Sequence, residues 1–470
     1  MRKKEVACLT EIIIRDGLIV LAAKQYKADI RIVGKKIAEI GSNLSKSDNT
    51  EQEIDARGLL VLPGGIDPHV HLSLPDFVPA KYQWADDFES GSKAALAGGI
   101  TTLGCISVPD KEETPLGTLQ REVKKAQQQI IADLMVHPVL RNPTEEIFQE
   151  FPQLVEKGCT TIKVFMVTKD FDEHSLEYLK ALKTAKDLGI LTMIHCEDYA
   201  IISATCETMM AEGRGSLRNY AESRPVVSEE VATQRAVAMC ESTGAPIYVV
   251  HLSSERALRV CEEAQARSLP VYVEGRPIFF YLTEDQYLKP DGALYVVQPP
   301  LRKGTDTAAL WDGLQKGTIH TVATDHAPHM REQKLDPSLN VTKLQPGINE
   351  LQVMLPMLHA KGVATGKISL ERFVALTSTN VAKLFGLYPQ KGTIQVGSDA
   401  DLVLWDLKEE REIKNEDMFS KTGFSIYKGM KITGWPQLTI RRGEIVYKDK
   451  KILASVGSGQ VVHQEKYQAL

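Results

Sequence analysis

The stretch Leu59-Leu-Val-Leu-Pro-Gly-Gly-Ile-Asp-Pro-His-Val-His71 joins an apolar run to two histidines that are two residues apart. Side chains alternate along a β-strand, so His69 and His71 point to the same side if this run is a strand. Two imidazoles at the end of one strand can bind one metal ion together. A lone pair of this kind is a weak indicator, because a histidine at a strand end is more often a hydrogen-bonded structural residue. The pair becomes informative only if other strands also end in metal ligands.

Apolar, β-branched runs recur through the middle of the chain, at 66–72, 100–107, 132–140, 160–166, 190–196, 246–252, 270–275 and 319–325. Stretches with helical spacing lie between them, for example 86–97, 119–131, 174–188 and 228–243. Near-continuous apolar strands that alternate with helices indicate parallel strands buried on both faces. Eight such units predict a (β/α)8 TIM barrel over residues 63–385. A doubly wound sheet is the competing fold, but no Gly-rich phosphate turn follows the first strand.

The two ends of the chain have a different pattern, with short strand-like runs separated by turns. Such runs occur at 11–15, 18–21, 29–33 and 37–41, and again at 392–397, 401–406 and 438–447. We therefore expect one small β-sandwich domain formed by residues 1–62 and 386–450. Residues 451–470 are expected to extend over the surface or onto a neighbouring subunit.

Composition excludes several classes of protein. The 470 residues carry a net charge of −5 with Lys and Arg spread along the chain, so no basic stripe suggests nucleic acid. No apolar run approaches the 20 or so residues of a membrane span. The start of the chain faintly resembles a signal peptide, but Glu11, Arg15 and Asp16 interrupt it. Seven cysteines without a CxxC motif favour free thiols, so we expect a cytoplasmic protein that acts on small molecules.

Ionisable residues stand at the ends of five of the eight predicted strands, where barrel active sites lie. They are His69, His71, Lys163, His195, His251 and Asp325. Burying such groups unpaired is costly, so their convergence at one mouth predicts a metal site. His137, His174, His320, His359 and His463 lack this placement and are expected to be ordinary core or surface residues.

Four histidines and one carboxylate are more than one Zn²⁺ needs and too few for two ions. A neutral Lys163 amine can add CO₂ to form a carbamate, an anionic ligand with two donor oxygens. The set therefore predicts two divalent ions and a carbamate on Lys163. Zn²⁺ is favoured, and Mn²⁺ or Co²⁺ would also suit nitrogen and oxygen ligands.

This residue set resembles the metal ligands of the amidohydrolase superfamily, in particular its cyclic amidohydrolases: hydantoinases, dihydropyrimidinases, allantoinases and dihydroorotases. The resemblance extends over about residues 10–450 and includes Gly98-Gly-Ile-Thr-Thr102 and Gln298-Pro-Pro-Leu-Arg302. It implies a TIM barrel with a carboxylated lysine and two metals, a β-sandwich built from both termini, and a homotetramer or dimer. A non-enzymatic, dihydropyrimidinase-like assembly protein is the alternative from a different class.

The substrate contacts implied by the resemblance differ from the usual ones. Hydantoinases and dihydropyrimidinases usually carry a tyrosine that binds the substrate and the oxyanion where this chain has Thr168, and a serine where it has Gln298. Their Asn-Gly-Leu-Pro-Gly motif becomes Lys343-Leu-Gln-Pro-Gly347. In contrast, Thr324-Asp-His-Ala-Pro-His329 is similar to dihydroorotases, whose last histidine helps to hold the substrate carboxylate. Thr168, Gln298, His329 and Gly347 are therefore the expected substrate contacts.

The implied reaction is hydrolysis of the C–N bond of a cyclic amide or imide, of hydantoinase or dihydropyrimidinase type. A hydroxide that bridges two metals would attack the carbonyl carbon. Asp325, as ligand and base, would take the proton and pass it to the departing ring nitrogen. Allantoinase and dihydroorotase activities are the alternatives within the family.

Overall fold

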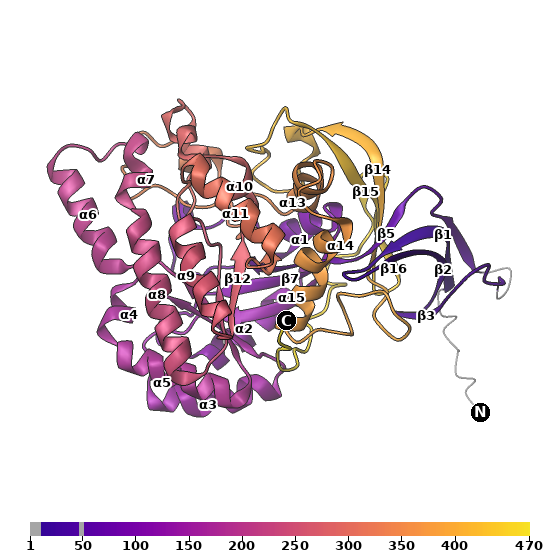
Figure 1. Cartoon of the computed structure of the whole chain (residues 1–470), viewed down its shortest axis with the longest axis horizontal. Helices are drawn as coiled ribbons and strands as arrows, with labels where there is room; N and C mark the ends of the chain where they lie inside the picture. The colour runs from indigo at the N-terminus through magenta and orange to yellow at the C-terminus, as the bar shows by residue number, and fades with distance from the viewer. Residues whose placement is uncertain (1–10, 47–50) are drawn as a thin grey trace.

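The computed structural model describes residues 11–46 and 51–470. Cys8 and the start of the chain compared above with a signal peptide lie outside the described residues. Figure 1 shows two parts: a set of strands surrounded by helices, and a bent sheet beside it that contains β1, β2 and β14.

The strands of the first part coincide with the eight predicted runs. They are β6 (Gly65–Val70), β7 (Ile100–Ser107), β8 (Asp133–Pro138), β9 (Thr161–Phe165), β10 (Leu191–His195), β11 (Ile247–Val249), β12 (Val271–Gly275) and β13 (Thr321–Val322). They pair in parallel, in the orders β6-β7-β8 and β9-β10-β11-β12-β13. Parallel bridges Val139–Lys163 and Val70–His326 join the two groups into a ring. The TIM-barrel prediction is confirmed.

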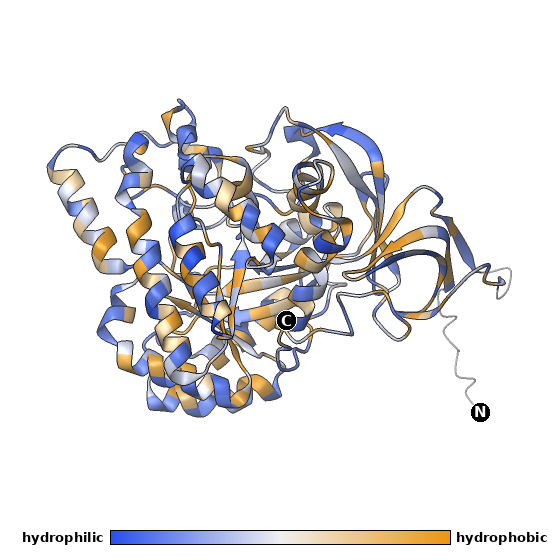
Figure 2. Cartoon of the chain, viewed as in Figure 1, coloured by the Kyte–Doolittle hydropathy of each residue, from blue (hydrophilic) through white to orange (hydrophobic). Residues whose placement is uncertain are grey.

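Helices surround this ring. The longer ones are α1 (Phe88–Ala97), α2 (Pro115–Ala126), α3 (Glu145–Glu156), α5 (Ser175–Leu188), α6 (Tyr199–Ala211), α8 (Val226–Thr243), α9 (Glu255–Ala266) and α11 (Gly304–Lys316). The shorter ones are α4 (Lys169–Glu173), α7 (Tyr220–Ser223), α10 (Pro277–Tyr281), α12 (Arg331–Lys334), α13 (Met354–Leu358), α14 (Leu370–Val374) and α15 (Asn380–Leu384). Figure 2 shows apolar strands inside and hydrophilic outer faces on the helices. None of the helices within the described ranges has the length and apolar composition that crossing a bilayer requires.

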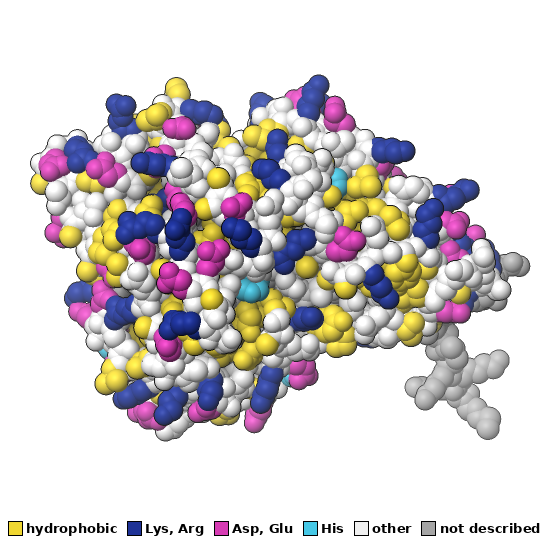
Figure 3. Space-filling model, viewed as in Figure 1, with side chains coloured by type: hydrophobic (Ala, Val, Ile, Leu, Met, Phe, Trp, Pro, Cys, Tyr) yellow, Lys and Arg dark blue, Asp and Glu magenta, His cyan; other side chains and the backbone are white. Residues whose placement is uncertain are grey.

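Local sequence explains where these helices begin. The predicted helix 119–131 instead spans Pro115–Ala126, because the Thr114 hydroxyl accepts the backbone N–H of Gly117 and Pro115 occupies the first helical turn. Asp87 and Ser90 form a capping box at the start of α1. On the face drawn in Figure 3, acidic and basic side chains are interspersed.

The second part is one nine-stranded sheet that both ends of the chain build. Its strands are β1 (Glu11–Val20), β2 (Gln25–Val33), β3 (Lys36–Gly41), β4 (Gln52–Asp55), β5 (Leu60–Pro63), β14 (Leu402–Glu412), β15 (Lys431–Arg441), β16 (Glu444–Lys448) and β17 (Lys451–Ile452). Antiparallel pairing of β14 with β5 joins the two halves. The expectation of a β-domain from both termini is confirmed. The predicted run 392–397 is not a strand, because Gly392 and Gly397 turn the chain with φ of +79° and +93°.

The C-terminal tail lies against the barrel of its own chain. Val461 pairs with Leu134 of β8, and the carbonyl of Gln460 accepts the N–H of Leu134. Further along, the N–H of Glu465 donates to Gly386, and that of Gln468 to Lys383. The tail therefore satisfies backbone groups at the end of the barrel opposite the ligand-bearing strand ends.

A substitution at Gly386 would test how much the contact between tail and barrel contributes to stability. A Cβ at Gly386 would lie 1.8 Å from the carbonyl oxygen of Glu465, and φ is +67°. Gly366, at φ +73° with open space around it, is the matched control. We expect Gly366→Ala to cost about 1–2 kcal/mol of stability, from the left-handed backbone alone. Gly386→Ala should lower the free energy of unfolding clearly more than Gly366→Ala does, as measured by thermal or denaturant unfolding. Equal losses for the two variants would show that the tail contributes little to stability.

Candidate metal centre

The six predicted ligands lie at one end of the barrel. His69 and Lys163 belong to β6 and β9, and His195 ends β10. His71, His251 and Asp325 follow the ends of β6, β11 and β13 within three residues. His251 and Asp325 have φ of +37° and +48°, a region that residues other than glycine rarely adopt. Such backbone persists only where surrounding contacts hold it, and it is frequent at functional sites.

His69, His71 and Asp325 form the first group of possible metal ligands. One ligand atom from each lies within 4.8 Å of the others, and all three residues are buried. The Oδ1 of Asp325 lies 2.8 Å from His71 Nε2 and 3.3 Å from His69 Nε2. The three side chains thus present donor atoms to a common point.

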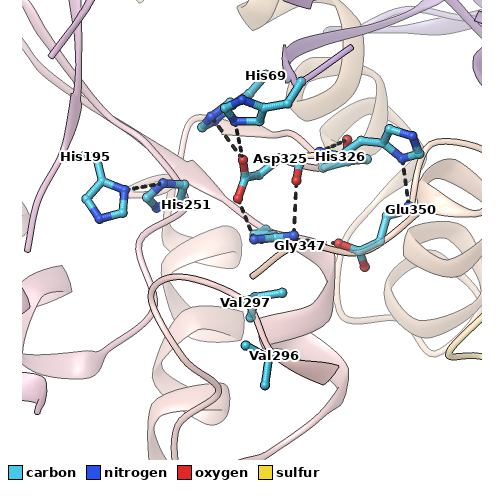
Figure 4. A network of polar contacts seen from close by, with 12 residues as sticks. His69, His195, His251, Val296, Val297, Asp325, His326, Gly347 and Glu350 are labelled. Carbon is cyan, nitrogen blue, oxygen red and sulfur yellow. Dashed lines mark hydrogen bonds and ion pairs between the residues drawn. The ribbon is translucent and has the colours of Figure 1, made fainter. Parts of the chain in front are cut away.

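His195 and His251 form a second pair beside the first group (Figure 4). His195 Nδ1 lies 3.1 Å from His251 Nε2. The rings of His69 and His251 have centroids 5.3 Å apart, so the two groups adjoin. This arrangement provides nitrogen ligands for a second ion next to the first.

Lys163 is fully buried, and its Nζ has no hydrogen-bond partner among the described residues. Burial lowers the pKa of this amine to about 8, although Glu274 and Asp325 act in the opposite direction. Its charge also helps to lower the pKa values of His69, His195 and His251, so it lies close to both histidine groups. An orphaned buried amine between two histidine groups fits a lysine that becomes an oxygen ligand by adding CO₂.

Two carboxylates that the sequence reasoning missed orient the histidines. Glu274 Oε1 accepts the Nδ1–H of His69 at 2.9 Å and the backbone N–H of His251 at 2.7 Å. Glu197 Oε2 accepts the Nε2–H of His195 at 2.8 Å. These bonds direct the free nitrogen lone pairs of His69 and His195 into the site, as carboxylates behind metal-bound histidines do. Both glutamates could have been suspected, since Glu274 ends an apolar run and Glu197 follows His195 by two residues.

The protonation states of the predicted ligands favour binding of a metal cation. Burial lowers the pKa values of His69, His195 and His251, which leaves neutral imidazoles. Burial would raise the pKa of Asp325, but the charge of Arg276 and a hydrogen bond with His71 bring it well below its ordinary value. Neutral imidazoles and an ionised carboxylate are the forms that bind divalent metals. The residues present therefore fit a divalent metal centre.

A second group of acidic residues, Asp133, Asp399 and Asp401, is a poor candidate. Lys391 Nζ lies 2.7, 3.1 and 2.6 Å from their carboxylates, respectively. The lysine already supplies the cation, and the cluster joins the start of β8 to the start of β14.

A cavity of about 270 Å³ opens next to the metal ligands. Of the predicted substrate contacts, Gln298, His329 and Gly347 line it. Tyr82, Trp84, Phe165 and Gln345, which the sequence reasoning did not single out, also line it. The two aromatic residues at 82 and 84 come from the loop after His71, where sequence gives no periodic signal.

Thr168 does not line this cavity, and its role as a substrate contact stays a prediction. Its hydroxyl donates to the carbonyl of Phe165 at 3.0 Å and accepts the N–H of Phe171, as the N-cap of α4. It faces a different hollow, which Asp170 and Tyr178 also line.

His329 lies in the cavity in its neutral form. Burial, together with the charge of Lys334, lowers its pKa to about 3. A neutral imidazole can still hold a substrate carboxylate through a hydrogen bond from its N–H, but it adds no charge, so the carboxylate-holding role of His329 stays a prediction.

Lys334 holds the wall of the cavity from behind. Its fully buried Nζ donates to the carbonyls of Val296, Gln345 and Gly347 at 3.0, 2.9 and 2.6 Å. These bonds join the segment before Gln298 to the segment 345–347.

Lys334→Met keeps the volume of the side chain and removes all three bonds. Each orphaned buried carbonyl costs about 1–3 kcal/mol, so the two segments should separate or rearrange. We expect KM to rise several-fold with metal content unchanged, measured by steady-state kinetics and metal analysis. An unchanged KM would show that the wall holds its shape without the lysine.

Comparison with known proteins agrees with this site. The model of the "Amidohydrolase family" matches residues 60–446. A D-hydantoinase of Geobacillus stearothermophilus is 37% identical over 463 residues, which cover 97% of each chain. The crystal structure of a dihydropyrimidinase from Brevibacillus agri has a TM-score of 0.92 and 35% identity, and the match covers 98% of this chain and 100% of that one.

An L-hydantoinase (dihydropyrimidinase) from Arthrobacter aurescens has a TM-score of 0.87 and 30% identity, over 96% of this chain and 99% of that one. Similarity thus extends over nearly the full length of the chain. The similar proteins include ones named D-hydantoinase, L-hydantoinase and dihydropyrimidinase. A metal-binding barrel mouth and a family match that spans most of the sequence lead to one conclusion: this chain belongs to the amidohydrolase family.

Proposed function

We propose that this protein is a hydrolase with two divalent metal ions that opens a cyclic amide or imide ring, of hydantoinase or dihydropyrimidinase type. The convergence of His69, His71, His195, His251 and Asp325 around the unpartnered Lys163 carries the proposal. The adjoining cavity of about 270 Å³ suits a small ring with one substituent.

One ion would be held by His69, His71 and Asp325, and the other by His195 and His251. A carbamate on Lys163 would complete both sites, with Zn²⁺ favoured and Mn²⁺ or Co²⁺ as alternatives. When bound, such ions supply a hydroxide nucleophile near neutral pH and polarise the scissile carbonyl.

Side chains of the protein would transfer the proton, bind the ring and exclude water. Asp325 would accept the proton of the attacking water and return it to the ring nitrogen, a contribution of typically about 10²–10⁴-fold. Gln298 and the segment 345–347 would bind the polar edge of the ring. Trp84 and Tyr82 would cover it and exclude water.

The cavity favours a neutral ring over a charged one. Among the described residues that line it, neither Lys nor Arg occurs, and His329 is neutral. A hydantoin or dihydropyrimidine ring fits this lining, allantoin remains an alternative, and dihydroorotate with its carboxylate is disfavoured. A cytoplasmic location, which the unpaired described cysteines favour, and a homotetramer or dimer stay predictions.

The test is ring opening, followed in the ultraviolet, by metal-loaded protein supplied with bicarbonate. Hydantoin, 5-phenylhydantoin, dihydrouracil, allantoin and dihydroorotate form the panel. We expect turnover of a hydantoin or dihydrouracil and none of dihydroorotate. Two bound metals without turnover of any member would contradict the proposed ring class. Absence of both metal and turnover would instead favour the non-enzymatic assembly protein.

A further inference from the structure

Arg276, directly after β12, is fully buried and contacts Asp325 twice. Its Nη1 lies 2.6 Å from Asp325 Oδ2, and its Nη2 donates to the backbone carbonyl of the same residue at 3.2 Å. Arg276 is not among the residues that line the cavity. Its contacts point to Asp325 and away from any substrate.

A second pair of residues holds the guanidinium from behind. Arg276 Nε lies 3.5 Å from Glu350 Oε2, and the hydroxyl of Tyr427 donates to Glu350 Oε1. Tyr427 precedes β15 of the sheet formed by both termini. These contacts form a chain from Tyr427 through Glu350 and Arg276 to Asp325, which connects that sheet to the metal centre. Figure 4 shows Glu350 and Asp325 in this network.

The geometry gives the guanidinium a specific effect. With Oδ2 and the backbone carbonyl of Asp325 both held by Arg276, only Oδ1 faces His69 and His71. The backbone of Asp325 has a φ of +48°, so its local conformation is not intrinsically preferred. Without this anchor, rotation about the side-chain torsions would turn the plane of the carboxylate away from the histidines or bring both oxygens toward the site.

We propose that Arg276 is a positioning residue that fixes the orientation of the Asp325 carboxylate, so that Oδ1 alone is presented to the metal centre. This inference rests on the proposed function, in which Asp325 is both metal ligand and base. Removing a residue that orients a ligand typically costs about 10–100-fold in activity or metal affinity. Because Arg276 acts through Asp325, its loss should matter only while Asp325 is present.

The experiment is a double-mutant cycle of Arg276→Met and Asp325→Asn in the metal-loaded enzyme, with Arg441→Lys as control. Arg441 ends β15 in the sheet formed by both termini, is 1% exposed and bonds Glu444 and Ser458, so it controls for disturbing a buried arginine. We expect Arg276→Met to lower kcat about 10–100-fold with KM within threefold, and Arg441→Lys to leave both unchanged. In the Asp325→Asn background, Arg276→Met should have almost no further effect.

Additive losses, or a kcat of Arg276→Met within threefold of the parent, would overturn the positioning role. Co²⁺ titration of the metal-free proteins provides a readout that needs no substrate. Arg276→Met should bind one of two Co²⁺ ions about 10–100-fold more weakly, while Arg441→Lys binds both normally. If the parent hydrolyses no ring, the proposed function fails, yet this titration still decides the role of Arg276: unchanged Co²⁺ affinity would overturn it.

Discussion

Lys163→Ala is expected to lose nearly all ring hydrolysis, by at least about 10³-fold, and to bind less metal than the parent. The reason is that the buried Nζ of Lys163 has no hydrogen-bond partner among the described residues, and its carbamate would supply the oxygens that the histidines lack. Steady-state kinetics and metal analysis of the purified variant measure the effect.

Small carboxylates provide the control for this variant. Removing the side chain leaves space beside both histidine groups, and acetate or propionate would offer two oxygens there. We expect millimolar propionate to restore part of the metal content and rate of Lys163→Ala and to leave the parent unaffected. A variant that retains two metals and full turnover without any added anion would show that Lys163 is not a ligand.

Asp325→Asn is expected to lower kcat by about 10²–10⁴-fold, even when metal is saturating. The amide keeps the shape of the side chain, but it cannot accept a proton as a carboxylate does. It also loses the charge that faces His69, His71 and Arg276. The measurement is kcat at several metal concentrations, so that weaker metal binding is separated from loss of the base.

Asp401→Asn is a matched comparison, since Asp401 is also buried and paired with a cation, Lys391, but lies in the link between barrel and sheet. We expect it to lower the melting temperature and to leave kcat unchanged. If Asp325→Asn kept kcat within tenfold of the parent at saturating metal, a different residue would have to move the proton.

The sequence by itself predicted the barrel and the six candidate ligands. Apolar runs such as 100–107 and 190–196 indicate strands that are buried on both faces. Eight such strands that alternate with helices are compatible with few folds other than a barrel. The ligands could be found because an ionisable residue at the end of an apolar run, such as His195 or Asp325, contrasts with its neighbours. Barrel topology then brings all strand ends to one mouth, whatever the loop lengths.

What surrounds those ligands was decided only by the tertiary structure. Glu274 meets His69, Arg276 meets Asp325 and Tyr427 meets Glu350 across separations of 205, 49 and 77 residues. Thr168 became a helix cap, and the 392–397 run became a turn. Such outcomes depend on the direction of individual side chains and on the loops between elements, which local periodicity does not encode. A repeating apolar pattern specifies which face is buried, whereas the partner of one buried charge is settled only when distant segments pack together.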